Sequence, residues 1–336
     1  MKKLNNPIQV GILGCGSFVQ RRILPILKEI NTIKVVALQK RNVNDAKNIA
    51  SKWNIPFAVS SRNELLSNPQ VEAVFIATTN DMHEQDAIAC AEASKPTLCE
   101  KPLAPTASAI LKMIEIFQKQ STPLFVGQSL RFKFCVRKAK ELLQSGRLGQ
   151  LLNIRAHFSI PVPKENWRHQ KVRGGGALQD IGVHLIDLIR FISDQEIHSI
   201  YAEANHDYQH TSSNADQTVS AICRLTHQAT ASFECSFQQP FSSRFEVIGT
   251  KSRLVSNDSL RQSYDSLETL CLIEDDTKLY YPIRASNIYS EELIHFADTL
   301  QGLTPSIIDA KEGLQNQKVI EAGYQSLSES RNIQVR

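Results

Sequence analysis

Apolar runs and helical patterns alternate along the first 128 residues of the chain. The apolar runs predict strands at 8–13, 33–38, 72–77, 96–100 and 123–127, with a weaker strand at 56–60. Helical patterns begin near Phe18, Asn44, Met82 and Thr106. Strands that are apolar on both faces and separated by helices are typical of a parallel, doubly wound sheet. We therefore expect a doubly wound α/β domain at residues 1–128.

The pattern changes after Gly127, where strictly alternating segments replace continuous apolar runs. Such alternation, clearest at 218–225 and 229–237, is typical of antiparallel strands with one covered face. The other elements expected here are helices at 134–144, 174–192, 291–300 and 309–328, strands at 151–160 and 244–250, and a polar loop at 161–173. These elements predict an α+β domain at 129–336 with an open, mostly antiparallel sheet. The helix at about 309–328 is a candidate to pack back on the first domain.

Composition narrows the possible functions. The 336 residues suffice for two domains, and a net charge of +4 is too small and too evenly spread to indicate a nucleic-acid partner. Seven scattered cysteines form no CxxC pair, so neither a disulfide framework nor a metal site is expected. No apolar window approaches the roughly 18 residues of a membrane span. A cytoplasmic enzyme or ligand-binding protein without a membrane partner is the expectation.

The helix expected at 174–192 carries polar groups where an apolar helix should have none. Asp180, His184 and Asp187 are spaced by four and three residues, which places them on one side. Gly182 interrupts the helix at a cost of about 1 kcal/mol relative to alanine. One interpretation is that Asp180 and His184 only satisfy each other in the core. The other is that they face a site, with Gly182 leaving room for a ligand and Asp187 paired within the protein.

The sequence GILGCGSFV follows the first strand and opens a helix. Gly14 and Gly16 allow a tight turn beside a pyrophosphate, and the helix start at Ser17 and Phe18 offers free N–H groups. Val19 stands where the third glycine of such a motif is usual, so a local adjustment is needed. The motif predicts dinucleotide binding, although a purely structural glycine turn is the alternative.

The end of the second strand reads Gln39-Lys40-Arg41 and has no carboxylate. A carboxylate there would bind the ribose 2′-hydroxyl of NAD, whereas two cations suit the 2′-phosphate of NADP. We therefore predict NADP as the preferred cofactor, with NAD as the alternative. The alternative is that Lys40 and Arg41 are ordinary solvated cations of a surface loop.

Lys101 lies between Glu100 and Pro102 at the carboxyl end of another strand, where ligands bind in sheets of this kind. Proline fixes the turn, so the lysine is held in place. A lysine beside a cofactor can polarise a substrate oxygen. Taken alone, the same residue would more often be a surface charge.

Together these features resemble the Gfo/Idh/MocA family of nicotinamide-dependent oxidoreductases, named after glucose–fructose oxidoreductase and inositol dehydrogenase. The resemblance covers nearly the whole chain. It rests on GILGCG, ATTNDMH, CEKPLA, SLRF, SGRLG, GGGALQDIGVH, EVIGT and DAKEGLQNQKVIEAGYQS, in that order. It implies an N-terminal Rossmann domain, a C-terminal mixed-sheet domain and often a cis Lys101–Pro102 peptide. Departures from the family pattern are Val19, Gln128 in place of asparagine, and Ser252 in place of glycine.

The resemblance implies that Lys101, Asp180 and His184 line the substrate pocket and are the catalytic residues. With the residue-based arguments above, it also assigns a set of residues to the cofactor. These are Gly14, Gly16, Ser17, Phe18, Lys40, Arg41, Thr78, Thr79, Asn80, His83, Glu100, Lys101, Gln128, Trp167 and Arg168. We expect the pocket to draw on both domains, as interdomain ligand sites do.

The predicted function is hydride transfer between NADP, or NAD, and a sugar, polyol or related hydroxy or oxo compound. His184 would exchange the proton, Asp180 would orient it or bind a substrate hydroxyl, and Lys101 would stabilise the developing alkoxide. Two alternatives stay open: a non-catalytic nucleotide sensor, and a glycosidase that retains NAD. The resemblance also favours a homo-oligomer, a dimer or tetramer.

Overall fold

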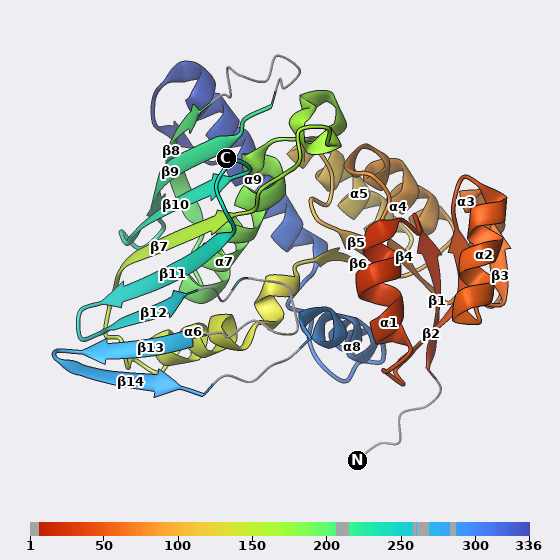
Figure 1. Cartoon of the computed structure of the whole chain (residues 1–336), viewed down its shortest axis with the longest axis horizontal. Helices are drawn as coiled ribbons and strands as arrows, with labels where there is room; N and C mark the ends of the chain where they lie inside the picture. Colours follow the sequence, from red (N-terminus) through yellow and green to blue (C-terminus); the bar gives the residue numbers. More distant parts are fainter. Residues whose placement is uncertain (1–6, 206–214, 258–259, 261–268, 283–286) are drawn as a thin grey trace. The chain divides into compact units, whose positions relative to one another are not determined.

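The computed structural model describes residues 7–205, 215–257, 260, 269–282 and 287–336 (Figure 1). The chain divides into two compact units. Unit 1 comprises Met1–Gln128 and Tyr289–Leu314, and unit 2 comprises Ser129–Ile288 and Gln315–Arg336.

Unit 1 is built on a six-stranded sheet in which every pair of neighbouring strands is parallel. The strands are β1 (Ile8–Leu13), β2 (Ile33–Gln39), β3 (Phe57–Val59), β4 (Ala73–Ile76), β5 (Thr97–Glu100) and β6 (Leu124–Gly127). Their order in the sheet is β3-β2-β1-β4-β5-β6. The order reverses direction between β1 and β4, so this is a doubly wound Rossmann sheet, and the predicted strands are confirmed.

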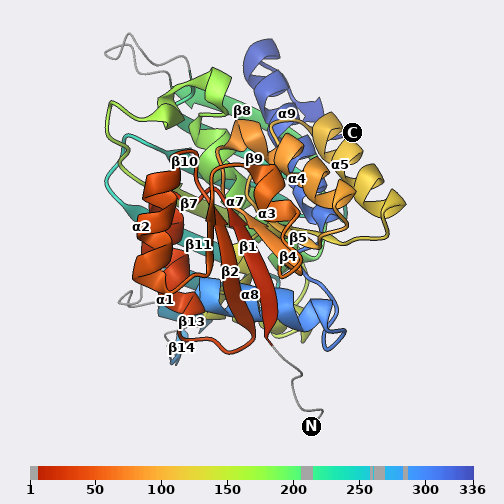
Figure 2. The same ribbon diagram turned by 90° about the vertical axis from the view of Figure 1, so that its right-hand side faces the viewer.

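Helices cover both faces of this sheet (Figure 2). They are η1 (Val19–Ile23), α1 (Leu24–Leu27), α2 (Val43–Trp53), α3 (Arg62–Leu66), η2 (Asn80–Met82), α4 (His83–Glu92), α5 (Ala107–Lys119) and α8 (Ile288–Leu300). Helices α1 and α2 lie on one side and α3, α4 and α5 on the other. Side-chain oxygens of Asn42, Ser61 and Thr106 accept hydrogen bonds from the first turns of α2, α3 and α5. Such N-caps satisfy donors that a helix start otherwise leaves free.

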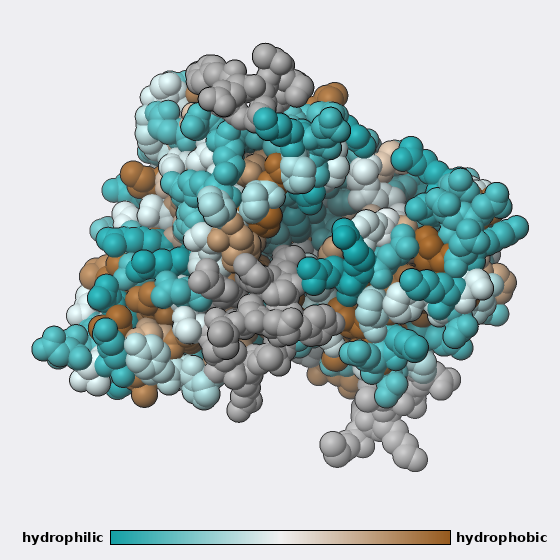
Figure 3. Space-filling view, viewed as in Figure 1, coloured by the Kyte–Doolittle hydropathy of each residue, from teal (hydrophilic) through white to brown (hydrophobic). Residues whose placement is uncertain are grey.

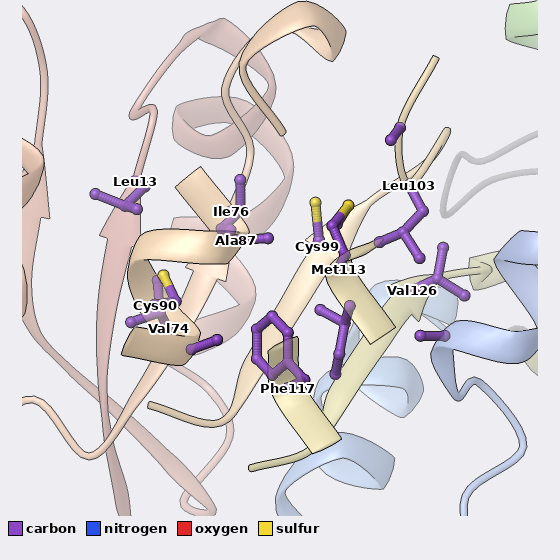
Figure 4. Packing of buried hydrophobic residues seen from close by; sticks show 14 of the residues in the cluster. Leu13, Val74, Ile76, Ala87, Cys90, Cys99, Leu103, Met113, Phe117 and Val126 are labelled. Atoms are coloured by element: carbon purple, nitrogen blue, oxygen red, sulfur yellow. The ribbon is translucent and has the colours of Figure 1, made fainter. Parts of the chain in front are cut away.

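The core under α4 and α5 is closely packed (Figure 4). Val74, Ile76 and Cys99 from the strands contact a layer that includes Cys90 of α4 and Phe117 of α5. The first turn of α9 (Ala310–Glu329) belongs to unit 1 and adds Ala310 and Leu314 to this core.

Unit 2 is built on a nine-stranded sheet with the order β14-β13-β12-β11-β7-β10-β9-β8-β15. The strands are β7 (Leu151–Ser159), β8 (Ile197–Asn205), β9 (Thr218–Leu225), β10 (Thr230–Ser236), β11 (Ser242–Gly249), β12 (Arg253–Asn257), β13 (Thr269–Glu274), β14 (Thr277–Tyr281) and β15 (Ile333–Gln334). Among the strand pairs of the described residues in this sheet, only β7–β10 is parallel. The predicted fold class, with a mostly antiparallel second sheet, is therefore confirmed.

Helices cover one face of the second sheet. They are η3 (Ser129–Phe132), α6 (Phe134–Gln144), η4 (Trp167–His169), η5 (Lys171–Arg173), η6 (Leu178–Gly182), α7 (Val183–Ser193) and the part of α9 from Gln315. The strict alternation of β9 follows from this, since every second residue is buried beneath the helices. Ile222, on the opposite face of β9, is 63% exposed.

Several elements were not predicted from the sequence. They are α3, β8, β12, β13, β14 and β15. In β8 the inward positions include the small residues Ala202 and Ala204, and a bulge between Ile197 and Ser199 breaks the alternation. The polar loop contains two single helical turns, η4 and η5. All seven cysteines are free and buried.

Among the helices of the described residues, none combines the length and apolar character that crossing a membrane requires. On the face shown in Figure 3, hydrophobic residues form small groups among hydrophilic ones. This distribution is ordinary for a protein surface.

Candidate functional site

The carboxyl edge of the sheet in unit 1 brings together many residues that the sequence assigned to a cofactor. Gly14, Gln39 and Thr78 directly follow or end the adjacent strands β1, β2 and β4. The N–H of Gly14 donates to the Gln39 side-chain oxygen at 3.3 Å. A Cβ added to Gly14 would lie 2.6 Å from the Thr78 nitrogen, and Gly14 has a φ of +85°. Only glycine fits at this position, next to the point where the strand order reverses between β1 and β4. Doubly wound sheets bind ligands at such a point.

Gly16 has open space on its exposed side. The nearest heavy atom to an added Cβ would be the Gly14 oxygen at 3.9 Å. The chain becomes helical at Ser17, and the helix widens into the π-helical turn η1 from Val19. This turn is the local adjustment expected where the third glycine is missing. Phe18 packs edge-on against Tyr289 of α8, with ring centroids 5.4 Å apart.

Lys40 and Arg41 follow β2 at the same edge. Lys40 Nζ lies 3.5 Å from the Asp45 carboxylate, an exposed and therefore weak ion pair. Arg41 is exposed and has no acidic partner among the described residues. The Gln39 side chain donates to the Ser60 carbonyl at 2.8 Å, which ties the end of β2 to the segment after β3.

The Thr78-Thr79-Asn80 stretch begins immediately after β4. The Thr78 hydroxyl donates to Asp86 at 2.8 Å, and the same carboxylate pairs with Arg62 at 2.8 Å. Asn80 is buried in the first turn of η2. These contacts fix the backbone beside Gly14.

His83 is buried at the start of α4. Its ring is 1% exposed and lies between two backbone carbonyls, those of Pro102 at 2.8 Å and Thr78 at 3.3 Å. Burial lowers the pKa of His83, which opposes the effect of these two carbonyls. The geometry makes His83 a link between the Thr78 segment and the Glu-Lys-Pro turn. The assignment of His83 to the cofactor stays a prediction.

Glu100, Lys101 and Pro102 form the turn after β5. The Lys101–Pro102 peptide is cis, as the family resemblance led us to expect. The Lys101 N–H donates to the Glu100 carboxylate at 3.3 Å, and Lys101 itself is half-buried. An added Cβ on Gly127 of the neighbouring strand would lie 3.3 Å from the same carboxyl group. Glycine at 127 therefore makes room for Glu100.

Gln128, at the end of β6, is 1% exposed. Neither its side-chain nitrogen nor its oxygen has a hydrogen-bond partner among the described residues. Leaving a buried polar group without a partner costs about 1–3 kcal/mol. A ligand amide or hydroxyl would satisfy these atoms, so the residues at this edge fit a nicotinamide dinucleotide: a glycine turn, a helix start and an unsatisfied amide.

In unit 2, Asp180 and His184 lie at the junction of η6 and α7. Asp180 stands in the π-helical turn, and His184 is the second residue of α7. They are 7% and 5% exposed, and the His184 ring lies 6.2 Å from that of Phe158. The Asp180 carboxylate accepts from Arg168 Nε at 2.6 Å, and the Arg168 guanidinium stacks 4.9 Å over Trp167. The sequence-predicted residues of unit 2 are thus brought together.

The expectation that Gly182 leaves room for a ligand is wrong. An added Cβ would lie 2.9 Å from the Leu178 side chain and 3.4 Å from the Cys235 sulfur of β10. The neighbours are protein atoms, so Gly182 allows the helix to pack closely on the sheet. The π-helical turn at the same place is the kind of irregularity that often marks functional helices.

Asp187 is paired within the protein, as one interpretation of the sequence expected. Its carboxylate accepts from Arg131 at 2.6 and 2.8 Å and from Asn316 at 2.8 Å. Burial raises the pKa of Asp187, but the Arg131 guanidinium and the hydrogen bonds outweigh this, so the pKa lies below its usual value. Arg190 donates to Asn316 and Glu196, which extends the network. Asp187 therefore has a structural role.

We expect Asp187→Asn to lower the free energy of unfolding by about 3–5 kcal/mol, because it leaves the Arg131 charge buried without a counter-charge. Because the folded-state pKa of Asp187 is depressed, its contribution to the free energy of unfolding is fully present at pH values above the usual carboxyl pKa. It is lost as pH falls through the folded-state pKa. Denaturant titration measures both effects. Asp194→Asn removes the same charge from an exposed pair with Lys140 and should cost about 0–1 kcal/mol. Equal losses in the two variants would contradict the assignment.

Asp216 and Tyr324 were missed by the sequence analysis. One Asp216 oxygen accepts from the Leu178 N–H at 2.8 Å and the other from the Tyr324 hydroxyl at 2.9 Å. Burial and the neighbouring Asp216 charge raise the pKa of Tyr324. Gly176 has no room for a Cβ between these two side chains. A buried carboxylate thus caps the helix that carries Asp180 and His184.

With this geometry in place, two family matches settle the class of the protein. Residues 8–128 match the oxidoreductase family with an NAD-binding Rossmann fold, and residues 136–255 match the GFO/IDH/MocA C-terminal domain. The chain therefore belongs to the Gfo/Idh/MocA family of NAD(P)-dependent oxidoreductases.

Individual relatives agree with this class. The chain is 29% identical over 255 residues to dTDP-3,4-didehydro-2,6-dideoxy-alpha-D-glucose 3-reductase of Saccharopolyspora spinosa, covering 75% of each chain. It is 26% identical over 296 residues to 1,5-anhydro-D-fructose reductase of Ensifer adhaerens, covering 87% of this chain and 88% of the relative. The fold is similar to the structure of aldose-aldose oxidoreductase from Caulobacter crescentus complexed with glycerol. The TM-score is 0.91 at 23% identity, over 98% of this chain and 99% of that one.

Proposed function

We propose that this chain is an NADP-preferring oxidoreductase that transfers hydride to or from a sugar, polyol or related oxo compound. The observation that carries the proposal is the burial of Asp180 and His184 side by side where η6 joins α7. Asp187 on the same helix has a structural role with Arg131 and Asn316. We assign the chemistry to Asp180 and His184. The relatives named above, whose names describe reductases acting on sugar derivatives, support the substrate class.

Each of the three proposed catalytic residues has a defined task. When bound, the nicotinamide supplies or accepts the hydride. His184 exchanges a proton with the substrate oxygen, since histidine works in both directions near neutral pH. Lys101 hydrogen-bonds the same oxygen and stabilises its developing negative charge. Asp180, held by Arg168, orients the substrate hydroxyl and His184.

The residues that we assign to the cofactor each bind a different part of it. The glycine turn at Gly14–Gly16 and the helix start at Ser17 bind the pyrophosphate. The side-chain amide of Gln128, which has no hydrogen-bond partner among the described residues, binds a polar group of the cofactor. Thr78 to Asn80 lie beside the nicotinamide. Trp167 and Arg168 of unit 2 remain proposed cofactor contacts through the family resemblance.

The preference for NADP rests on the end of β2. Gln39 occupies the position where a carboxylate would select NAD, and its amide is already engaged with Gly14 and Ser60. Arg41 and Lys40 are the cations available to a 2′-phosphate. A carboxylate at position 39 could not donate to the Ser60 carbonyl.

We expect Arg41→Ala to raise the KM for NADPH about tenfold and to leave the KM for NADH nearly unchanged, because only NADPH carries the 2′-phosphate. Steady-state assays that follow reduced nicotinamide absorbance with a panel of aldoses, ketoses and inosones measure this. Lys47→Ala on the exposed side of α2 is the matched control and should change neither value. Wild-type turnover that is equal or better with NADH would overturn the NADP preference.

We also propose that the chain forms a homo-oligomer through the uncovered face of the sheet in unit 2. This face has a depression of about 560 Å³ lined by residues of both charge signs, including Arg155, Arg244, Glu203 and Glu246, beside Ile222. Such a surface can pair with a copy of itself. Size-exclusion chromatography should show a species well above 37.7 kDa, reduced by Ile222→Arg but not by Leu111→Arg on α5. Elution of the wild type as a monomer would contradict the proposal.

A further inference from the structure

Positive charge is concentrated in one short segment of unit 2. Residues 161–173 contain Lys164, Arg168, Lys171 and Arg173 but only one acid, Glu165. This gives a net charge of four minus one, or +3, against +4 for the whole chain. We refer to residues 164–173 as the basic segment.

The basic segment is anchored to the start of the helix that carries Asp180 and His184. The Gly175 N–H donates to the Gln170 carbonyl at 3.0 Å, and the Gly176 N–H donates to the Arg168 carbonyl at 2.9 Å. An added Cβ on Gly175 would collide with the Arg168 carbonyl, so glycine is required there. The segment therefore has a fixed backbone next to the proposed reaction site.

Side chains add two further anchors. The His169 ring lies 2.9 Å from the side-chain oxygen of Gln217, the residue before β9, and 3.0 Å from the carbonyl of Pro163, the residue before the segment. Lys171 Nζ lies 5.6 Å from the centre of the Tyr324 ring, and Tyr324 in turn binds Asp216. Together with the backbone bonds, these contacts fix the backbone that carries the cations.

Two of the four cations, Lys164 and Arg173, have no counter-charge among the described residues of the unit. Arg168 uses Nε to bind Asp180, and its Nη atoms have no hydrogen-bond acceptor among the described residues. Lys164 and Arg173 are exposed, and neither has a carboxylate partner in the described part of the chain. Holding like charges together without counter-ions is unfavourable, and an incoming oxyanion would relieve it.

We infer that the substrate carries an oxyanion group, a carboxylate or a phosphate, which the basic segment binds while the reacting carbon lies at Asp180 and His184. This inference rests on the proposed function and narrows its substrate class. The cofactor's phosphates have other proposed binding groups in unit 1, the glycine turn and Arg41. The planar Nη edge of Arg168, which the family resemblance also assigns to the cofactor, suits the two oxygens of a carboxylate or phosphate.

The first test measures binding without turnover. Inorganic phosphate and acetate are titrated separately by calorimetry into the full chain saturated with NADPH, so that the pyrophosphate site is filled. The double variant Lys164→Gln/Arg173→Gln should weaken binding of the matching anion about tenfold. Lys278→Gln, an exposed cation on β14, is the matched control and should leave binding unchanged. Equal binding by wild type and the double variant would overturn the inference.

The second test compares substrates that differ in the group at carbon 6, which is neutral in D-glucose and anionic in D-glucuronate and D-glucose 6-phosphate. The anionic sugar that is the better substrate, carboxylate or phosphate, identifies the group. The double variant should raise KM for that sugar about tenfold with little change in kcat, and should leave KM for D-glucose unchanged. Preference for D-glucose, or an increase in KM for NADPH instead, would overturn the inference while leaving the oxidoreductase assignment intact. Failure to bind NADPH at all would instead refute the proposed function.

Discussion

Replacing Lys101 with methionine should lower kcat about a thousandfold while NADPH still binds. In the proposed mechanism the ammonium group of Lys101 stabilises negative charge that develops on the substrate oxygen, and losing one such donor costs about 10²–10³ in kcat. Methionine keeps a similar length and apolar stem but cannot donate a hydrogen bond. Stopped assays of turnover and a fluorescence titration of NADPH separate the chemical effect from cofactor binding.

The local structure explains why this side chain should be sensitive. Lys101 follows β5 directly, its N–H is bound by Glu100, and the next carbonyl, that of Pro102, is held by the buried His83. The backbone is therefore fixed on both sides of the lysine, which reduces the reorganisation needed during the reaction. Lys101→Arg, which retains the charge but changes its shape, should recover only part of the activity.

Lys112→Met provides the control for this prediction. Lys112 lies on α5 of the same unit and forms an exposed pair with Glu84, with 59% of its side chain exposed. It should keep wild-type kcat and KM. Full activity in Lys101→Met would remove Lys101 from the mechanism, whereas loss of NADPH binding in that variant would assign it to the cofactor alone.

The sheet of unit 1 could be predicted because its signals are local. Each strand is a short apolar run, and the Gly14 turn and the cis Lys101–Pro102 turn lie beside the strands that position them. Even the departure at Val19 pointed to the place where the helix becomes π-helical. In unit 2, strict alternation identified β9 and β10, but β8 has small inward residues and a bulge, which leave no clear period.

The partners of the site residues could not be predicted in the same way. Arg131 binds Asp187 across 56 residues of sequence, and Asp216 caps the helix 38 residues before it. Nothing in the local pattern distinguishes these residues from other buried polar groups. The role of Gly182 was misread for the same reason, since its close neighbour Cys235 comes from β10.

His184 offers the second large effect, because it is the proposed proton donor and acceptor. His184→Ala should lower kcat about 10²–10⁴-fold, the usual contribution of a positioned general acid or base. It should also flatten the dependence of kcat on pH near neutrality, where histidine ordinarily titrates. A pH series of steady-state assays in both reaction directions measures this, because the same group must give the proton in one direction and take it in the other.

A merely structural role for His184 predicts a different outcome. Removing a buried ring, 5% exposed and packed near Phe158, would then lower the free energy of unfolding but leave the shape of the pH profile unchanged. His198→Ala, an exposed histidine on β8, should alter neither kcat nor the profile. Since Asp180 is proposed to orient His184, Asp180→Asn in the His184→Ala background should add little further loss of kcat. Additive losses in the double variant would show that the two side chains act independently and that the proposed pairing is wrong.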